Sequence, residues 1–159
     1  MREASIISTS DAMDILPATI RDLNSLRHLE KTCFPKDAWP LLDLLAVLTW
    51  PEVIRLKAVI HGEMVGFIAA DTRRSKDLTW IATIGILPEY RRRGIARALL
   101  EACEAQISSD RIRLCVRDYN NPAIEMYRSA GYLPTDTWQR YYNDGGDALV
   151  MEKKRNSET

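Results

Sequence analysis

Apolar residues recur at two different periods along the chain, and the period separates strands from helices. Short runs rich in β-branched and aromatic residues, bounded by Gly, Pro or Asp, predict strands. These runs cover residues 13–20, 53–60, 64–72, 78–87, 111–117, 133–142 and 147–154. Apolar residues spaced three and four apart predict amphipathic helices instead. The helical stretches cover residues 21–34, 40–50, 95–106 and 121–131.

The order of these elements predicts an α+β fold, which is a mixed α/β architecture in three layers. About 6–7 strands form a mixed, mostly antiparallel sheet, and helices cover both of its faces. The run "LTWIATIGIL" (78–87) is almost entirely apolar, so we expect it to lie at the centre of the sheet. The turns "HGE" and "NDGG" each predict a hairpin.

Length and composition predict one domain and exclude some partners. The chain has 159 residues, of which we assign 12–154 to the domain, 1–11 to a flexible N-terminal tail and 155–159 to a C-terminal tail. Lys plus Arg and Asp plus Glu both number 22, so the net charge is zero and a general nucleic-acid binder is not expected. The sequence leaves monomer and homodimer both open, and near-zero net charge does not indicate the charge of a partner.

Cysteine usage and hydropathy indicate the compartment. Three cysteines, Cys33, Cys103 and Cys115, lack metal-ligand spacing and predict buried thiols in a reducing environment, with no metal site. We see no signal peptide, and the run 40–50 is too short to span a bilayer. We therefore expect a cytoplasmic protein without membrane attachment.

Three arginines stand where the backbone favours an anion. Arg91, Arg92 and Arg93 directly precede Gly94 and the helix that begins at Ile95. A helix N-terminus carries free N–H groups and partial positive charge, so a strand, a glycine turn and a helix in this order bind phosphate. A bound polyanion would supply the missing negative charge. The alternative from the residues alone is a solvated run of charges beside an ordinary helix.

Two segments resemble one known family. "IGILPEYRRRGIARALL" resembles the acetyl-CoA-binding motif of the Gcn5-related N-acetyltransferases (GNAT), with Arg91, Gly94 and Ala96 at its key positions. Downstream, "VRDYNNPAIEMYRSAGY" resembles the family's second segment, with Asn120 and Tyr127 at its key positions. The resemblance covers almost the whole chain and implies the GNAT fold.

The resemblance also implies how acetyl-CoA would bind. Backbone amides of Arg91, Arg92, Arg93, Gly94, Ile95 and Ala96 would hold its diphosphate. The strand at Ile84, Gly85 and Ile86 would pair with the pantetheine arm where it splays from strand 111–117, and the N–H of Ile86 would polarise the thioester oxygen. Asn120 would contact the pantetheine portion, although it could also be only a helix N-cap. Tyr127 would protonate the leaving thiolate, and the alternative is a packed aromatic residue.

Two further stretches indicate which kind of molecule accepts the acetyl group. "RYYNDGGDALVM" and "LEKTCFPKDAW" are similar to segments around the peptide site of RimI-type protein N-terminal acetyltransferases. This similarity implies that Tyr141 and Tyr142 contact the first residues of a peptide, and that Phe34 and Trp39 line its entrance. Alternatively, the two tyrosines are a cross-strand pair that shields a sheet edge.

The general base is the least defined group. RimI-type enzymes carry a glutamate where this chain has Cys115, so candidate bases are Glu30, Asp37 or a water relayed by backbone carbonyls. An α-amine with a pKa near 8 is about one-tenth neutral at pH 7. The pKa of a lysine is about 2.4 units higher, so removing its proton costs roughly 3.3 kcal/mol more. A weak base therefore suits an α-amine better than a lysine.

We accordingly predict direct acetyl transfer from acetyl-CoA to the α-amine of a peptide or protein N-terminus. Two alternatives remain open: transfer to a small amine (an amino acid, a polyamine or an aminoglycoside), and a catalytically silent acyl-CoA-binding module.

Overall fold

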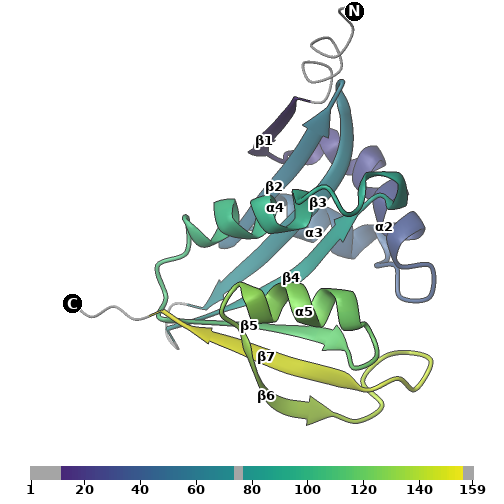
Figure 1. The fold of residues 1–159 in the computed structure, drawn as a ribbon. Helices are drawn as coiled ribbons and strands as arrows, with labels where there is room; N and C mark the ends of the chain where they lie inside the picture. The colour runs from purple at the N-terminus through teal and green to yellow at the C-terminus, as the bar shows by residue number, and fades with distance from the viewer. Residues whose placement is uncertain (1–11, 74–76, 156–159) are drawn as a thin grey trace, which may run out of the picture.

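The computed structural model describes residues 12–73 and 77–155, and its elements follow the order expected from the sequence (Figure 1). The strands are β1 (Met13–Pro17), β2 (Val53–Ile60), β3 (Glu63–Arg73), β4 (Leu78–Ile86), β5 (Arg111–Arg117), β6 (Leu133–Trp138) and β7 (Ala148–Lys154). The helices are α2 (Leu23–Cys33), α3 (Leu41–Thr49), α4 (Ile95–Glu104) and α5 (Asn121–Ser129), with short 3-10 turns η1 (Ile20–Asp22) and η3 (Pro88–Tyr90).

The strands form one sheet in the order β1-β2-β3-β4-β5-β7-β6. All neighbouring strands are antiparallel except β4 and β5, which run parallel. Strand β4 is the fourth of seven, so the expected central position of its apolar run is confirmed. The expected mixed α/β class with a mostly antiparallel sheet is confirmed as well.

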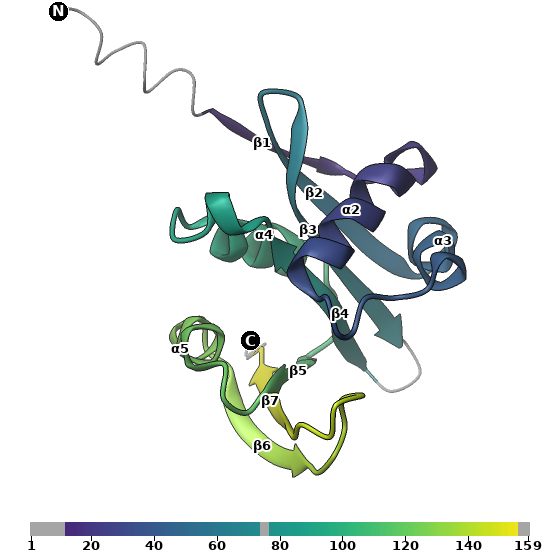
Figure 2. The ribbon, with the colours of Figure 1, turned by 90° about the vertical axis from the view of Figure 1, so that its right-hand side faces the viewer.

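Helices cover both faces of the sheet (Figure 2), and two glycines show how closely they approach. A Cβ added at Gly66 on β3 would lie 3.1 Å from Leu99 of α4. A Cβ added at Gly85 on β4 would lie 3.1 Å from Leu29 of α2, on the other face. The absence of a side chain at each position therefore lets a helix lie directly on the backbone of the central strands.

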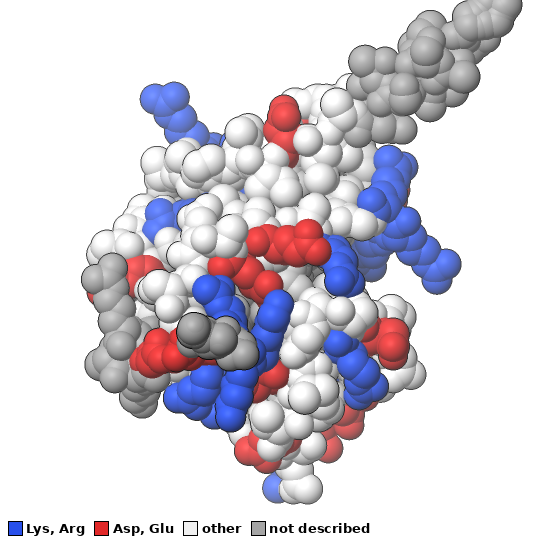
Figure 3. All heavy atoms as spheres, turned by 60° about the vertical axis from the view of Figure 1, so that its left-hand side comes forward, with Lys and Arg blue, Asp and Glu red and all other residues white. Residues whose placement is uncertain are grey.

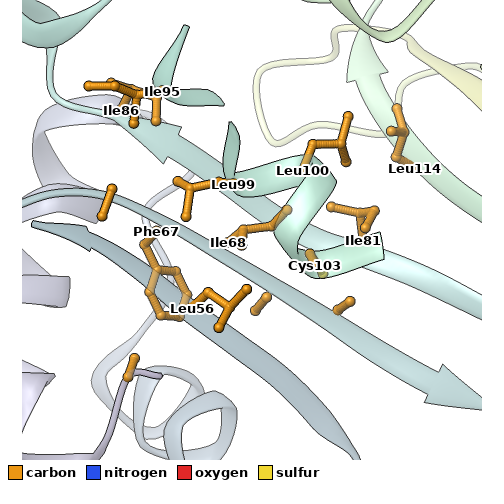
Figure 4. Packing of buried hydrophobic residues seen from close by; sticks show 14 of the residues in the cluster. Leu56, Phe67, Ile68, Ile81, Ile86, Ile95, Leu99, Leu100, Cys103 and Leu114 are labelled. Atoms are coloured by element: carbon orange, nitrogen blue, oxygen red, sulfur yellow. The ribbon is translucent and has the colours of Figure 1, made fainter. Parts of the chain in front are cut away.

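The apolar stripe of α4 fills the core on its face (Figure 4). Leu99 and Cys103 lie beside Ile68 and Ile81 of the central strands, Leu100 points toward Leu114 of β5, and all of them are buried. Phe67, next to Ile68 on β3, points to the opposite face, as the two-residue period of a strand requires. The sheet thus has a buried layer on each side.

Strands β4 and β5 separate soon after they meet, which creates what we call the β4–β5 split. They pair at only three positions, the last being Trp80 with Arg113. A bulge in the β3–β4 ladder follows directly and leaves Ala82 without a partner on β3. Bulges bend a strand, and Figure 1 shows β4 diverging from β5 toward its C-terminal end. The splay implied by the family resemblance is therefore present.

Strands β1 and β6 end well before the positions that the sequence predicts. Strand β1 ends at Pro17 because Thr19 opens the 3-10 turn η1 with a reciprocal cap, in which its amide donates to Asp22 over 2.8 Å. Strand β6 ends at Trp138 because Asp147 accepts a hydrogen bond from the amide of Arg140 over 2.9 Å and stabilises a loop. Residues 139–147, including both tyrosines, form this β6–β7 loop. The tyrosines therefore do not form a cross-strand pair.

The expected tails fall mostly outside the described residues, which begin at 12 and end at 155. Arg155, assigned to the C-terminal tail, is instead anchored to the domain. Its guanidinium donates to the carbonyl oxygens of Glu104, over 2.9 Å, and Ile107, over 2.7 Å. The folded unit therefore extends at least to this residue.

Acidic and basic side chains alternate on the surface, as Figure 3 shows for one face. Ion pairs such as Lys153–Glu104 (2.9 Å) and Arg113–Glu152 (2.6 Å) join the strands to each other and to α4. Within residues 12–73 and 77–155 there is no group of three or more His, Cys, Asp or Glu residues arranged to hold a metal. No helix in the same ranges is long and apolar enough to cross a membrane.

Candidate active site

In the turn before α4, several backbone N–H groups converge on one place. Arg92 (φ 65°) and Gly94 (φ 80°) both adopt left-handed conformations, and alternation of this kind makes a concave nest of N–H groups. The first helical hydrogen bond runs from the amide of Ala98 to the Gly94 carbonyl over 3.0 Å. The amides of Ile95 and Ala96 therefore have no acceptor in the helix. A Cβ at Gly94 would meet nothing within 4 Å, so the space beside this glycine is open.

The arginine side chains are partly committed to the protein itself. Arg91 donates from Nε to the carbonyl of Ile86 over 2.9 Å. The guanidinium of Arg93 lies over the ring of Tyr90, 5.0 Å from its centroid. In the structure, the backbone forms the cradle, and the arginines add positive charge around it.

Near the end of β4, backbone N–H groups point into the β4–β5 split. The amide of Leu87 donates to the Val65 carbonyl over 2.9 Å, so Gly66 and Ile86 form a pair without mutual hydrogen bonds. By the alternation of an antiparallel ladder, the N–H and C=O groups of Ile84 and Ile86 point away from β3. The Ile86 carbonyl accepts from Arg91 and from the Cys33 thiol (3.3 Å), which leaves its N–H directed into the split.

Tyr127 of α5 is buried, with 5 % of its surface exposed. Burial raises the pKa of its hydroxyl, and the nearby Tyr142 raises it further, so the phenol stays protonated at neutral pH. Its ring packs edge-on against Tyr132, with centroids 6.0 Å apart. Asn120 caps this helix, since its side-chain oxygen accepts from the amide of Ala123 over 3.4 Å. The alternative N-cap interpretation of Asn120 is confirmed, and a contact with the donor stays a prediction.

Glu30 lies buried on the opposite face of β4, which we call the acceptor face. Its carboxylate accepts hydrogen bonds from the Trp39 amide (3.2 Å) and the Thr83 hydroxyl (3.3 Å). Burial raises the pKa of Glu30, and these two hydrogen bonds offset only part of that effect. The carboxylate thus joins the α2–α3 loop to β4 and is more basic than an exposed glutamate.

Asp37, the other candidate base, is held in an ion pair. Arg117 at the end of β5 donates from Nη2 to Asp37 and from Nη1 to Asp144 over 2.9 Å. The same guanidinium lies over the ring of Tyr142, 4.2 Å from its centroid. We call this group of four residues the Arg117 clamp, and it joins the α2–α3 loop to the β6–β7 loop.

The four residues expected to contact an acceptor lie on this same face. Phe34 packs directly over Gly85, and its ring would lie 3.2 Å from a Cβ placed there. Trp39 follows on the α2–α3 loop and packs against the core, whereas Tyr141 and Tyr142 contact each other edge-on on the β6–β7 loop, with centroids 5.0 Å apart. Cys115 lies close to both tyrosines, and burial raises the pKa of its thiol to about 11, so it is not a thiolate at neutral pH.

Sequence reasoning missed Thr83 and the clamping role of Arg117. Thr83 is the only hydroxyl between Trp80 and Ile86 on β4, and a polar residue inside an apolar strand is a signal for a site. Arg117 was noticed only as part of a motif, because its partners are 80 and 27 residues away along the chain. No local pattern of residues indicates that these three side chains meet.

Comparisons with known proteins agree with this geometry. A sequence model described as "Acetyltransferase (GNAT) family" matches residues 23–132. An N-alpha-acetyltransferase of Saccharolobus solfataricus is 39% identical over 150 residues, which cover 86% of this chain and 89% of that protein. An L-amino acid N-acetyltransferase of Escherichia coli is 31% identical over 112 residues, which cover 65% of this chain and 69% of that protein.

Solved structures with the same fold include enzymes of related activity. The ribosomal-protein-S18-alanine N-acetyltransferase of Escherichia coli superposes with a TM-score of 0.84 at 23% identity, covering 93% of this chain and 97% of that one. Arabidopsis thaliana Naa50, solved with a bisubstrate analogue, superposes with a TM-score of 0.79 at 25% identity, covering 89% and 98%. The first of these likenesses concerns the fold alone.

Proposed function

The chain belongs to the GNAT family of acetyltransferases, and from that premise we propose that it acetylates the α-amino group of a peptide or protein N-terminus. The donor is acetyl-CoA, which supplies an acetyl group activated as a thioester. One observation supports the proposal most strongly. The β4–β5 split has the nest of backbone amides before α4 on one face of the sheet, and the α2–α3 and β6–β7 loops, which Arg117 joins, on the other.

The residues of the turn fit a diphosphate. The amides of Ile95 and Ala96 point out of the helix start, and the space above Gly94 is open. Arg92 and Arg93 lie within the same turn and add favourable charge for a polyanion. Asn120 lies at the start of α5, on the same face of the sheet as α4, where it can contact the arm of the donor.

Two groups at the split act on the reacting atoms. The N–H of Ile86 donates to the carbonyl oxygen on which negative charge builds as the amine attacks. The hydroxyl of Tyr127 donates its hydrogen bond, and with it the proton, to the sulfur as the C–S bond breaks. Solvent then returns a proton to Tyr127. Direct transfer requires no covalent intermediate on Cys115, whose thiol is protonated at neutral pH.

Glu30 accepts the proton that the amine loses. Its raised pKa brings it nearer to the working pH, which makes it a better base than an exposed carboxylate. Asp37 is a poorer candidate because Arg117 already holds its carboxylate. A buried glutamate is still a weak base for a lysine, whose pKa is about 2.4 units above that of an α-amine. The acceptor is therefore an α-amine.

A small α-amine is the second candidate, and one relative favours it. The Escherichia coli protein that is 31% identical acts on L-amino acids, which also present an α-amine. Its match covers 65% of this chain, against 86% for the N-alpha-acetyltransferase that is 39% identical. A peptide acceptor also accounts for the aromatic residues on the α2–α3 and β6–β7 loops beside the split.

Mass spectrometry of one peptide tests the proposal. The peptide carries a free α-amine and an internal lysine, and it competes with equimolar free amino acids and a polyamine for acetyl-CoA. We expect acetylation at the α-amine of the peptide, and Tyr127→Phe should lower kcat about a hundredfold or more. Acetylation only of the lysine or of the small amines would overturn the peptide assignment.

A further inference from the structure

Four aromatic rings form a continuous row on the acceptor face. Tyr142, Tyr141, Trp138 and Trp80 contact in turn, with centroid separations of 5.0, 5.5 and 5.7 Å. Trp138 lies on β6 and Trp80 on β4, with β5 and β7 between them in the sheet, so the curvature of the sheet brings the two indoles together. We call these four residues the aromatic row.

The aromatic row is not part of the hydrophobic core. None of its four residues belongs to the buried cluster of the described chain or to the half-buried residues packed against it. Tyr141 exposes 52 % of its surface. Figure 2 shows that α2 and α3 lie over the β2–β4 half of this face, and that no helix of the described residues covers β5, β7 and β6 there. Trp80, Trp138 and Tyr142 are partly buried and Tyr141 is exposed, so the row presents aromatic surface to solvent outside the main hydrophobic core.

Polar contacts hold the rings in fixed orientations. The indole N–H of Trp138 donates to Asp136 over 3.1 Å. Arg113 lies over Trp80, 5.9 Å from the ring centroid, and is itself held by Glu152 at 2.6 Å. Arg117 lies over Tyr142 at the other end of the row. Rings ordered in advance lose little conformational freedom when a ligand binds, which is a property of recognition surfaces.

The row begins where the acceptor amine must arrive. Tyr142 lies close enough to Tyr127 to affect its ionisation, and it contacts the clamp that joins the two acceptor loops. The four rings extend over a path of about 16 Å, which an extended peptide covers with about five residues at roughly 3.3 Å each. A peptide whose amine reaches the split thus has the length to place its following residues over the row.

Resting on the proposed function, we propose that the aromatic row binds the acceptor peptide downstream of its first residue. It selects peptides with aromatic or large apolar side chains at about the third and fifth positions, because side chains on one face of an extended chain repeat every second residue.

Three acceptors with the same first two residues test this. They are a seven-residue peptide with Phe at positions 3 and 5, the same peptide with Ser at both positions, and the dipeptide amide. We expect the KM of the Phe peptide to be about threefold to tenfold lower than that of the Ser peptide, with a similar kcat. Equal KM values for the two seven-residue peptides would overturn the proposal.

Variants of the row separate recognition from folding. Trp138→Ala and, independently, Trp80→Ala should abolish the preference for Phe and leave the KM of the dipeptide amide unchanged, whereas Trp138→Phe should keep the preference. Trp50→Ala is the matched control, since Trp50 is 60 % exposed at the end of α3, outside the row. An equal rise in KM for all three acceptors would mean a structural role and overturn the proposal.

Failure of the proposed function gives a different result. In that case, none of the three acceptors would be acetylated, while a free amino acid would be.

Discussion

Glu30 shows at the scale of one residue how the fold prepares a group for chemistry. A helix-surface glutamate would normally be solvated, but Glu30 is only 2 % exposed and lies between a loop amide and a strand hydroxyl. Burial disfavours the charged form and so raises its pKa, while the two hydrogen bonds keep the carboxylate in place. The residue therefore combines a structural contact with a carboxylate that is more basic than an exposed one, which suits the proton transfer that we propose for it.

Replacing Glu30 with Gln should change the pH profile. In the wild-type enzyme, the base is lost as pH falls through the raised pKa of Glu30, so kcat declines on the acidic side. Glu30→Gln should lower kcat about a hundredfold and remove this acidic limb, while titration of the acceptor amine near pH 8 remains in kcat/KM.

Initial rates between pH 5 and 9 at saturating peptide measure this effect. Asp37→Asn is the matched control, because it also replaces a carboxylate near the acceptor face but should keep the acidic limb. An unchanged acidic limb in Glu30→Gln, with acetyl-CoA binding intact, would assign the base to another group.

At the scale of elements, the Arg117 clamp connects parts of the chain that the sheet alone does not hold together. Asp37 lies on the α2–α3 loop, Arg117 ends β5, and Asp144 lies on the β6–β7 loop. A bidentate guanidinium fixes the distance between its two carboxylates. The clamp therefore sets the separation of the two loops that flank the β4–β5 split.

Removing the clamp should weaken acceptor binding selectively. Arg117→Ala frees both loops, so we expect the KM of the acceptor peptide to rise about tenfold or more, with little change in the affinity for acetyl-CoA. Arg117→Lys keeps the charge but loses the fork, so it should restore only part of the loss.

Steady-state kinetics with varied peptide, together with calorimetry for acetyl-CoA, give both quantities. Lys57→Ala is the control, since it removes a 2.8 Å ion pair with Asp22 of comparable burial on β2. A parallel loss of acetyl-CoA affinity in Arg117→Ala would contradict a role confined to the acceptor loops.

The elements show which features a sequence can predict. Helices and strands follow from hydrophobic periods, and the α4 turn follows from Gly94, because these signals are local. The ends of β1 and β6 were misjudged, since a cap at Thr19 and a loop hydrogen bond at Asp147 compete with an apolar pattern. The clamp was unpredictable for a different reason: its contacts depend on tertiary packing between distant segments.

At the scale of the whole molecule, we assign the donor and the acceptor to opposite faces of the sheet. Helices α4 and α5 lie on the face to which we assign the donor, and α2, α3 and the two loops of the Arg117 clamp lie on the other. β4 and β5 pair at only three positions, and we propose that donor and acceptor meet where the strands separate, near the Ile86 amide and Tyr127. Direct transfer needs such a meeting point, since donor and acceptor must meet without a covalent enzyme intermediate.

Calorimetric titration of the purified protein with acetyl-CoA, compared with S-acetyl-pantetheine, tests the central claim most directly. The amides at the start of α4 should hold the diphosphate, so acetyl-CoA should bind at one site with a dissociation constant in the micromolar range, and the fragment that lacks the diphosphate should bind at least about a hundredfold more weakly. Absence of binding by acetyl-CoA at millimolar concentration to the folded protein, or equal affinity for the two ligands, would contradict the account.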